Sequence, residues 1–509
     1  MQGFDFTPHP SPLTPHKTMS RRILIALLCL FFTLYLACGI FLVYYGRYTG
    51  DEGWYAYVSA IVWQGRRPYR DFLYSQTPVL PYFYGAFFSL FGHNLYTGRW
   101  ISLGCAAVAL ALIVATAIRR GSLFSGLLAL ILLGTNLSFI FDTTSIKTQA
   151  LTGLWLALTL YFAALAEPDN WRGALANIFA ALALLTRLSM LPLVILLWIY
   201  LWRMYRPAYG RLCLCIAPGM AVLAGVISHF WSDNLWFGTV GMHRIMGRHK
   251  SWGTVKLFLR GFLSNQLIIC LLLVGLLLFF TFNLLKYSGR FSMIKFDFEA
   301  FTLASYICIS TMHLAAPTMY PIYQTSIIFL AALWVSLKLG RIAQQRLSGR
   351  QLKYLVLTLL LACMLNIKLQ EHGIAFYPGR NLSGIDHIAR IVSGLPANPG
   401  KLISFDPGIA FQSGVPLLPG YEEGDFSFFP YLGDKDASDF RVTNFNAFRQ
   451  QIATGQAGIL ALRYRDIAIL KPQDIQDIIQ LIKQGYKPVK TIKGYGQFGD
   501  SMNIFVKKG

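Results

Sequence analysis

Long apolar runs alternate with short polar segments over most of the chain. A helix needs about 20 apolar residues to cross a membrane, and eleven runs between residues 23 and 368 approach that length. They predict spans at roughly 23–45, 100–118, 122–141, 150–166, 174–187, 190–202, 212–230, 262–285, 299–315, 319–337 and 352–368. The pattern predicts a polytopic α-helical membrane protein with about 11 transmembrane helices. The two short runs that meet at Thr186-Arg187-Leu188-Ser189 could instead form one bent hairpin.

From about residue 370 the pattern changes. Residues 401–405, 458–462 and 501–506 are strand-like, and residues 472–485 form an amphipathic helix with Ile475, Ile478, Ile479 and Ile482 on one face. Turn sequences such as Asp406-Pro-Gly separate these elements. We therefore expect three parts: a disordered N-terminus (1–22), a membrane domain (23–369) and a C-terminal α+β domain (370–509).

Composition agrees with a membrane protein, because 55% of the 509 residues are hydrophobic and only 13% are charged. Residues 1–369 contain 30 Lys and Arg against 10 Asp and Glu, whereas residues 370–509 contain 15 against 13. The basic excess therefore belongs to the membrane part, where phosphate head groups are natural partners. A nucleic-acid-binding protein is expected to carry its basic surface on a soluble domain, so we expect no nucleic-acid partner.

Basic residues also predict the orientation in the membrane. Lys17, Arg21 and Arg22 precede the first span and place the N-terminus in the cytoplasm. Eleven spans then put the C-terminal domain outside, and we expect a multi-pass protein of the bacterial inner membrane. Two predicted outer loops, 46–99 and 231–261, are long and basic. Their charge opposes the orientation rule, which favours a functional explanation.

The first outer loop contains the stretch GDEGWYAYVSAIVWQGRRPYRDF at residues 50–72. As a helix, 51–64 places Trp54, Val58 and Ile61 on one face, a pattern typical of a helix lying in the membrane interface. Asp51 falls in its first turn, where the helix dipole stabilises a negative charge. This carboxylate could accept a proton from an attacking hydroxyl, or it could simply cap the helix.

Several cations are candidate phosphate ligands. Arg66, Arg67, Arg70 and Arg99 could hold a phosphate through bidentate contacts, or they could sit among lipid head groups. Arg187 is an isolated charge at membrane depth, which makes it a functional candidate, although it could also be a helix-end residue reaching the interface.

Further polar groups leave similar alternatives open. A cluster of basic residues in the second long loop could bind lipid phosphate or form a solvated face. The cluster contains His243, Arg244, Arg248, His249 and Lys250. Asp142 and Lys147 could pair across the outer ends of two spans. No cluster of Asp, Glu and His residues indicates a required metal.

The order of these features resembles a known family. One N-terminal span is followed by Asp51-Glu52, by Gly65-Arg-Arg-Pro-Tyr-Arg-Asp-Phe, by a helix led by Thr77-Pro78, by Phe91-Gly92 and by Arg99. Thr186-Arg187, His313 and Pro317-Thr-Met-Tyr320-Pro continue the series. In outline, residues 20–340 resemble the GT-C membrane glycosyltransferases, and in particular the superfamily of protein O-mannosyltransferases and aminoarabinose–lipid A transferases.

The resemblance implies a GT-C-like fold and inverting sugar transfer, without a cofactor. The donor would be a polyprenyl-phosphate sugar and the acceptor a lipid, glycan or protein at the outer face. It assigns the general base to Asp51, with Glu52 beside it and Asp71 as a second acidic residue. Arg66, Arg67, Arg70, Arg99, Arg187 and Tyr320 would bind the substrate and its phosphate. The sequence departs from the aminoarabinose transferases at Ser75-Gln76-Thr77-Pro78, where they carry Glu-Lys-Pro-Pro.

Two other functions are compatible with a polytopic membrane protein. A transporter or flippase of lipid-linked sugars is expected to show an internal repeat or acidic residues deep inside its spans, and neither is found in the sequence. A non-catalytic scaffold would bind a partner through its outer domain and would not require the carboxylates and arginines of the first loop.

Overall fold

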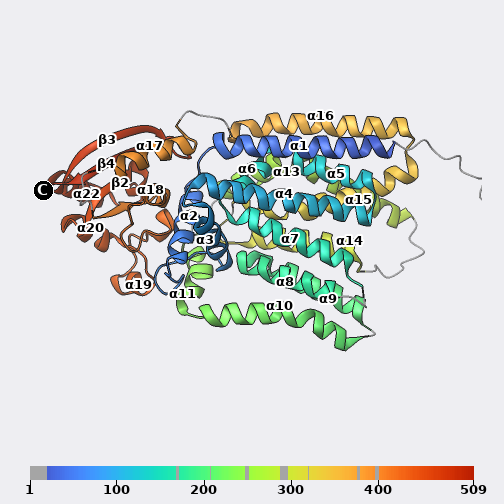
Figure 1. The fold of residues 1–509 in the computed structure, drawn as a ribbon, viewed down its shortest axis with the longest axis horizontal. Helices are drawn as coiled ribbons and strands as arrows, with labels where there is room; N and C mark the ends of the chain where they lie inside the picture. The colour runs from blue at the N-terminus through green and yellow to red at the C-terminus, as the bar shows by residue number, and fades with distance from the viewer. Residues whose placement is uncertain are drawn as a thin grey trace, which may run out of the picture.

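The computed structural model describes residues 20–167, 171–206, 208–246, 252–286, 296–318, 320–374, 379–395 and 400–509. Of the N-terminal segment predicted to be disordered, residues 1–19 lie outside these ranges, as do Arg248, His249 and Lys250. A bundle of long helices makes up one end of the molecule, and a smaller part containing the C-terminal sheet lies at the other (Figure 1).

The bundle contains α1 (Arg21–Tyr45), α4 (Leu95–Arg120), α5 (Leu123–Gly134), α6 (Leu137–Thr144), α7 (Thr148–Leu165), α8 (Arg172–Thr186), α9 (Leu191–Tyr205), α10 (Tyr209–Phe230), α13 (Trp252–Lys286), α14 (Phe298–Ala315), α15 (Ile328–Arg346) and α16 (Gly349–Ile374). Within the described ranges, seven helical segments are long and apolar enough to cross a membrane. There are eight if α5 and α6, bent by 73° at their junction, form one broken span. The chain is an integral membrane protein, and the count of eleven spans stays a prediction.

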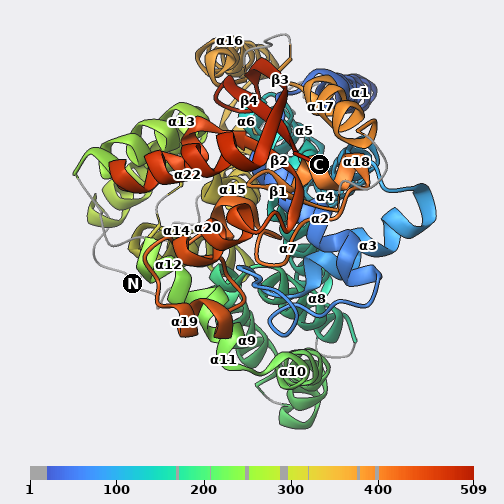
Figure 2. The ribbon, with the colours of Figure 1, turned by 90° about the vertical axis from the view of Figure 1, so that its left-hand side faces the viewer.

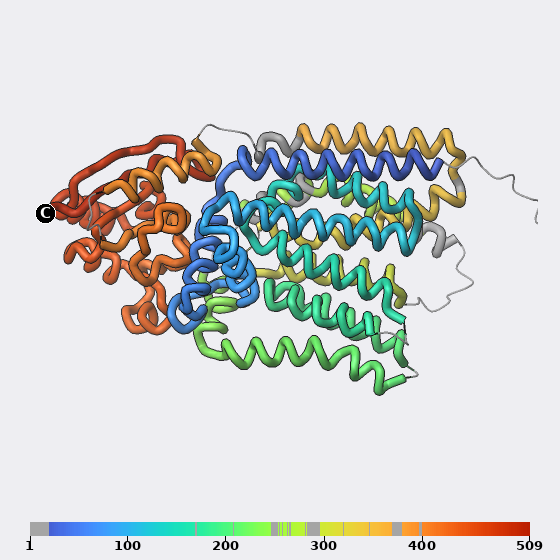
Figure 3. Tube along the Cα trace, viewed as in Figure 1, coloured from blue at the N-terminus to red at the C-terminus, as the bar shows by residue number. Residues whose placement is uncertain are grey.

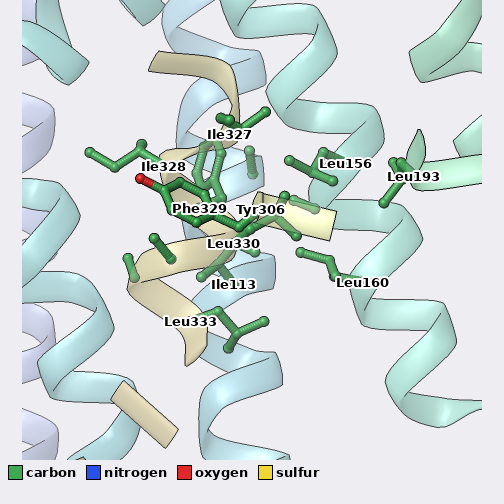
Figure 4. Close-up of a cluster of buried hydrophobic side chains, with 14 of the residues drawn as sticks. Ile113, Leu156, Leu160, Leu193, Tyr306, Ile327, Ile328, Phe329, Leu330 and Leu333 are labelled. Carbon is green, nitrogen blue, oxygen red and sulfur yellow. The ribbon is translucent and has the colours of Figure 1, made fainter. Parts of the chain in front are cut away.

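Fully buried side chains from several helices form the centre of the bundle (Figure 4). Ile113 of α4, Leu160 of α7, Leu193 of α9 and Phe329 of α15 are among them. Gly153 of α7 permits the close approach of Phe329, since a Cβ at this position would lie 2.7 Å from the ring. Lipid tails are as apolar as leucine, so close packing of this kind, more than exclusion of water, holds helices together in a membrane.

Two shorter helices, α2 (Gly50–Trp63) and α3 (Val79–Phe91), follow α1. The sequence correctly predicts α2 as a helix. Its position at the membrane interface stays a prediction, but its apolar face does not meet lipid, because all residues from Glu52 to Val62 are buried by protein. The aromatic and apolar side chains of α2 face α3 and the C-terminal segment instead of lipid.

A four-stranded sheet organises the C-terminal segment. Its strands are β1 (Lys401–Ser404), β2 (Ala457–Arg463), β3 (Tyr486–Tyr495) and β4 (Asp500–Lys507), in the order β1-β2-β4-β3. β1 and β2 are parallel, and the other two pairs are antiparallel. Three strands agree with the sequence prediction, whereas β3 was not predicted: most of its central residues are exposed and three of them are lysines, so it lacks a buried apolar face.

Helices and single turns complete the C-terminal segment. They are α17 (Leu382–Ser393), α18 (Pro407–Ser413), η5 (Gly424–Ser427), α19 (Asp434–Asp439), α20 (Phe445–Ala453), α21 (Tyr464–Ile467) and α22 (Pro472–Gly485). In α22, Ile478 and Ile482 are buried, and Ile475 and Ile479 pack against the same core. The amphipathic helix predicted at 472–485 is confirmed. Figure 2 shows the sheet with α20 and α22 in front of the bundle.

The C-terminal segment meets the bundle through α2 and α3, which lie between the two parts (Figure 3). Helix α18 packs directly on α2. At their closest point, a Cβ on Gly53 would lie 2.6 Å from the backbone nitrogen of Gly408 and 2.9 Å from the Asp406 carboxylate. A glycine in the first turns of α2 therefore lets the backbone of α18 approach.

Candidate active site

A cavity of about 660 Å³ lies where the ends of the bundle helices meet the C-terminal segment. This volume is typical of sites for small molecules. One wall comes from the start of α2, from the residues between α6 and α7, and from the segment that leads into η4 (Pro321–Ile327). The opposite wall comes from the C-terminal segment, through residues 405–407, Glu423, 425–426, Arg463, Arg465 and 496–498.

Asp51 lines this cavity from the first turn of α2. The residue that caps the helix is Thr49, whose backbone N–H donates to the carboxylate of Glu52 at 3.1 Å. Capping is therefore supplied by Thr49 and Glu52. Asp51, offset by about 100° around the helix from Glu52, is half-buried and turned toward the cavity.

Glu52 and Arg99 do not line the cavity. They form a buried ion pair, with Arg99 Nε 2.7 Å from Oε2 of Glu52. The Arg99 guanidinium also donates to the carbonyl oxygens of Leu42, Val43 and Gly46 at the end of α1. Because these partners occupy both side chains, we remove Glu52 from the catalytic candidates and Arg99 from the phosphate ligands.

Arg187 follows the last turn of α8 with an extended backbone, and it lines the cavity. Its guanidinium lies 4.6 Å from the centre of the Tyr323 ring, and one of its nitrogens donates to the Thr148 hydroxyl at 3.4 Å. The side chain is 7% exposed, yet it has no ion-pair partner within hydrogen-bond distance among the described residues. An arginine held this way has N–H groups left for an anion.

Asp51 and Arg187 interact electrostatically across the same space. Tyr55, one turn after Asp51, lies close to both. Burial raises the pKa of the Tyr55 hydroxyl, the Asp51 carboxylate raises it further, and Arg187 lowers it. Tyr320 also lines the cavity and interacts with Asp51. The structure thus brings together three residues selected from the sequence: Asp51, Arg187 and Tyr320.

The other candidates of the first loop lie outside the cavity. Arg66 donates to Glu422 at 2.8 Å and to the carbonyl of Asp71 at 2.9 Å, so it ties the loop to the C-terminal segment. Arg70 pairs with Asp71 at 2.9 Å, and this hydrogen bond lowers the pKa of the Asp71 carboxyl. Arg67 is exposed, and its backbone N–H donates to Asp71. In the structure these four residues shape the loop and do not meet Asp51.

Two further polar groups considered from sequence line the cavity. Lys147 lies 3.6 Å from Asp142, which also accepts a hydrogen bond from Thr325 at 2.9 Å, so the predicted pairing is present. His243 of α12 (Met242–Met246) reaches the Ser75 carbonyl at 3.4 Å, and burial lowers the pKa of its ring. In the part of the chain that the structure describes, no three His, Cys, Asp or Glu side chains are grouped to hold a metal.

The C-terminal segment contributes residues that sequence reasoning missed. Asp406 accepts hydrogen bonds from the hydroxyls of Tyr48 and Tyr495, at 2.5 and 2.7 Å. Arg463 pairs with Asp466 at 2.7 Å. Glu423 is fully buried beside Ser75. The sequence offered one signal, the adjacent carboxylates Glu422-Glu423 in a stretch that contains several aromatic residues. Asp406-Pro-Gly was interpreted only as a turn.

No family model and no curated protein matches this sequence, but solved structures match its fold. ArnT from Cupriavidus metallidurans in the apo state superposes with a TM-score of 0.58 at 13% identity, over 95% of this chain and 97% of ArnT. The chain has the GT-C fold. The fold class predicted from the sequence is therefore confirmed.

Two further structures with the GT-C fold carry ligands. ArnT bound to undecaprenyl phosphate matches with a TM-score of 0.58 at 12% identity, over 96% of this chain and 98% of ArnT. The Archaeoglobus fulgidus oligosaccharyltransferase, tethered to an acceptor peptide, matches with a TM-score of 0.52 at 11% identity, over 93% of this chain and 73% of that protein. At these identities the similarity establishes the shared fold.

Proposed function

We propose that this GT-C protein transfers a sugar from a polyprenyl-phosphate-linked donor to a lipid, glycan or protein acceptor at the outer face of the membrane. The observation that carries the proposal is that a half-buried carboxylate, Asp51, and a buried arginine, Arg187, line the same cavity and interact electrostatically. The ligands bound to ArnT and to the oligosaccharyltransferase, an undecaprenyl phosphate and an acceptor peptide, belong to the same classes.

Asp51 acts as the general base in this mechanism. Its carboxylate accepts the proton of the acceptor hydroxyl, and the oxygen attacks the anomeric carbon of the donor sugar. The bond from that carbon to the phosphate oxygen breaks on the opposite side, so a single displacement inverts the anomeric configuration. The proton then leaves Asp51 for solvent or for the released phosphate.

Arg187 stabilises the leaving group. The polyprenyl phosphate gains negative charge as the bond breaks, and a guanidinium already fixed over Tyr323 can meet that charge without reorganising. Tyr320 lies in the same wall and supplies a hydroxyl for the substrate. Because most of the arginine is buried, water screens this interaction poorly, which strengthens it.

The same proposal also predicts which parts of the chain lie on each side of the membrane. The N-terminus would be cytoplasmic, residues 23–369 would form the catalytic membrane domain, and residues 370–509 would lie outside, in the periplasm of a bacterium. The cavity between the bundle and the C-terminal segment then faces the side on which the donor sugar is presented.

Mass spectrometry of lipid-linked glycans, from cells with and without the protein, tests the function. We expect one sugar modification to be missing in the deletion and restored by the wild-type gene, but not by Asp51→Asn at equal expression. An unchanged glycan profile would contradict transfer and favour the transporter or scaffold alternatives.

A further inference from the structure

Glu423 is a carboxyl group of the C-terminal segment built into the wall of the cavity. It precedes the single turn η5 and its backbone N–H donates to the Ser427 hydroxyl at 2.9 Å. One side-chain oxygen, Oε1, accepts hydrogen bonds from the backbone N–H and the hydroxyl of Ser75, at 2.7 and 3.1 Å. Its position is therefore fixed by both parts of the molecule, since Ser75 belongs to the first long loop.

The second oxygen of this carboxyl, Oε2, is buried and has no hydrogen-bond partner among the described residues. Glu423 as a whole is fully buried, yet it lines the cavity. A buried polar atom without a partner is rare and calls for an explanation. A substrate group that enters the cavity would supply the missing partner.

Titratable groups surround Glu423 on several sides. The Glu423 carboxyl interacts electrostatically with Tyr55 of α2 and with Tyr69 and Tyr74 of the first long loop. The charge of the neighbouring Glu422 repels a negative charge on Glu423. His243 contacts the carbonyl of the same Ser75. Burial, opposed in part by the Ser75 hydrogen bonds, raises the pKa of Glu423 to about 8. The carboxyl is therefore mostly protonated at neutral pH.

A protonated carboxyl has one donor and free acceptor positions, which match a sugar hydroxyl. It would also not repel the phosphate that Arg187 is proposed to hold. Tyr55 interacts with Asp51, Arg187 and Glu423 together. Glu423 thus lines the same cavity as the proposed base and the proposed phosphate site.

We propose that Glu423 binds a hydroxyl group of the transferred sugar, so that the C-terminal segment forms part of the donor site. This inference rests on the proposed function, because it assumes a sugar attached to a polyprenyl phosphate. It goes further by assigning recognition of the sugar to a residue outside the membrane bundle, and by naming hydroxyl groups as what is recognised.

Binding of defined lipids to the full-length protein in detergent tests the inference. The probes are undecaprenyl phosphate and the same lipid carrying glucose, mannose or 4-amino-4-deoxyarabinose. The variants are Glu423→Ala and Glu423→Gln, and the matched control is Glu422→Gln, an adjacent carboxylate that pairs with Arg66 outside the cavity. Thermal unfolding of each variant establishes that it is folded.

We expect the wild type to bind a hydroxyl-bearing sugar lipid more tightly than undecaprenyl phosphate alone. Glu423→Ala should lose this additional affinity for the sugar lipid, which amounts to roughly tenfold for one hydrogen bond. It should still bind undecaprenyl phosphate. Glu423→Gln should keep most of the gain, because an amide also donates and accepts. Between pH 7 and 9, the additional affinity of the wild type for the sugar lipid should decrease. The additional affinity of Glu423→Gln should not change over this range.

Different failures are distinguishable. A gain retained in Glu423→Ala, or a pH dependence that persists in Glu423→Gln, would overturn the role of Glu423. Tighter binding of only the amino-sugar lipid, lost in Glu423→Gln, would overturn hydroxyl recognition in favour of an ammonium partner. If the protein binds undecaprenyl phosphate but gains nothing from any sugar, this inference alone is wrong. If it binds none of the lipids, the proposed function fails as well.

Discussion

Glu52 of α2 and Arg99 of α4 form an ion pair from which water is excluded, with side-chain exposures of 0% and 1%. The same guanidinium joins the end of α1 through three backbone carbonyls. This pair fixes the start of α2 against two bundle helices. Because Asp51 is the preceding residue, the pair also sets the direction in which Asp51 faces.

Removing one partner of this pair should destabilise the protein severely. Arg99→Ala leaves the Glu52 carboxylate buried without its cation, which typically costs about 3–5 kcal/mol. We expect a large loss in the free energy of unfolding, measured by denaturation in detergent. Arg67→Ala, at an exposed position in the neighbouring loop, is the control and should change stability little. Equal stability of the two variants would contradict a structural role for Arg99.

Asp51→Asn should abolish sugar transfer and leave the fold intact. An amide keeps the shape of the side chain but does not accept the proton, and general base catalysis typically contributes roughly 100- to 10,000-fold. The matched control is Asp71→Asn, a carboxylate of the same loop that pairs with Arg70 outside the cavity. Transfer rates measured on cell membranes decide between them. Similar rates for both variants would show that Asp51 is not the base.

Arg187→Gln should weaken binding of undecaprenyl phosphate. A hydrogen bond to a charged group contributes about 1.5–3 kcal/mol, which corresponds to roughly 10- to 100-fold in affinity. Arg70→Gln provides the comparison, because this arginine is exposed and does not line the cavity. Dissociation constants in detergent provide the measurement. A larger loss in Arg70→Gln would move the phosphate site to the first loop.

Arg66→Ala should loosen the contact between the first loop and the C-terminal segment. It removes the cation from Glu422, whose side chain is only 2% exposed, although Glu422 still accepts a hydrogen bond from Gly420. Leaving a buried acceptor short of a partner costs about 1–3 kcal/mol. Limited proteolysis should cut this variant faster than the wild type, whereas Arg70→Ala should resemble the wild type. Unchanged protection would mean that the apolar contacts of α18 with α2 suffice.

Glu423 should make stability depend on pH. Its pKa is raised from the ordinary 4.5 to about 8 in the folded protein, so the folded state holds the proton more tightly than the unfolded state. This contribution to stability is complete below pH 4.5 and is lost as pH rises toward 8. The wild type should therefore lose melting temperature relative to Glu423→Gln between pH 5 and 8. A constant difference between their melting temperatures would contradict the raised pKa.

Apolar runs were sufficient to predict a bundle of membrane-length helices, because a spanning helix needs about 20 mostly apolar residues. They did not show the 73° bend between α5 and α6 within the single span predicted at 122–141. The order of motifs along residues 20–340 was sufficient to indicate the GT-C fold. What covers the aromatic face of α2 was not predictable in the same way. Its aromatic face is compatible with lipid or with protein, and only the docking of α18 beside Gly53 shows that protein covers it.

The local sequence pattern likewise could not show which charged residues of the first loop bind a substrate and which stabilise the fold. Arg66 and Arg99 both belong to this loop, yet Arg66 pairs with Glu422, 356 residues away, and Arg99 with Glu52, 47 residues away. Glu423 was missed for the same reason, since its partner Ser75 lies in a different part of the fold. Pairing of distant charges depends on packing, about which a single stretch of sequence contains little information.

The sequence alone determined that this is a polytopic membrane protein with a C-terminal α+β segment, and it selected Asp51 and Arg187 as candidates. The membrane spans and the α+β segment follow from local composition and periodicity, whereas the role of Asp51 as the base is what the resemblance to the GT-C family implies. The tertiary structure decided which of two adjacent carboxylates faces the cavity, because a helix turns about 100° per residue and Arg99 forms an ion pair with Glu52. It also decided that the C-terminal segment closes the site, since contacts between residues more than 300 positions apart form only when the two parts dock.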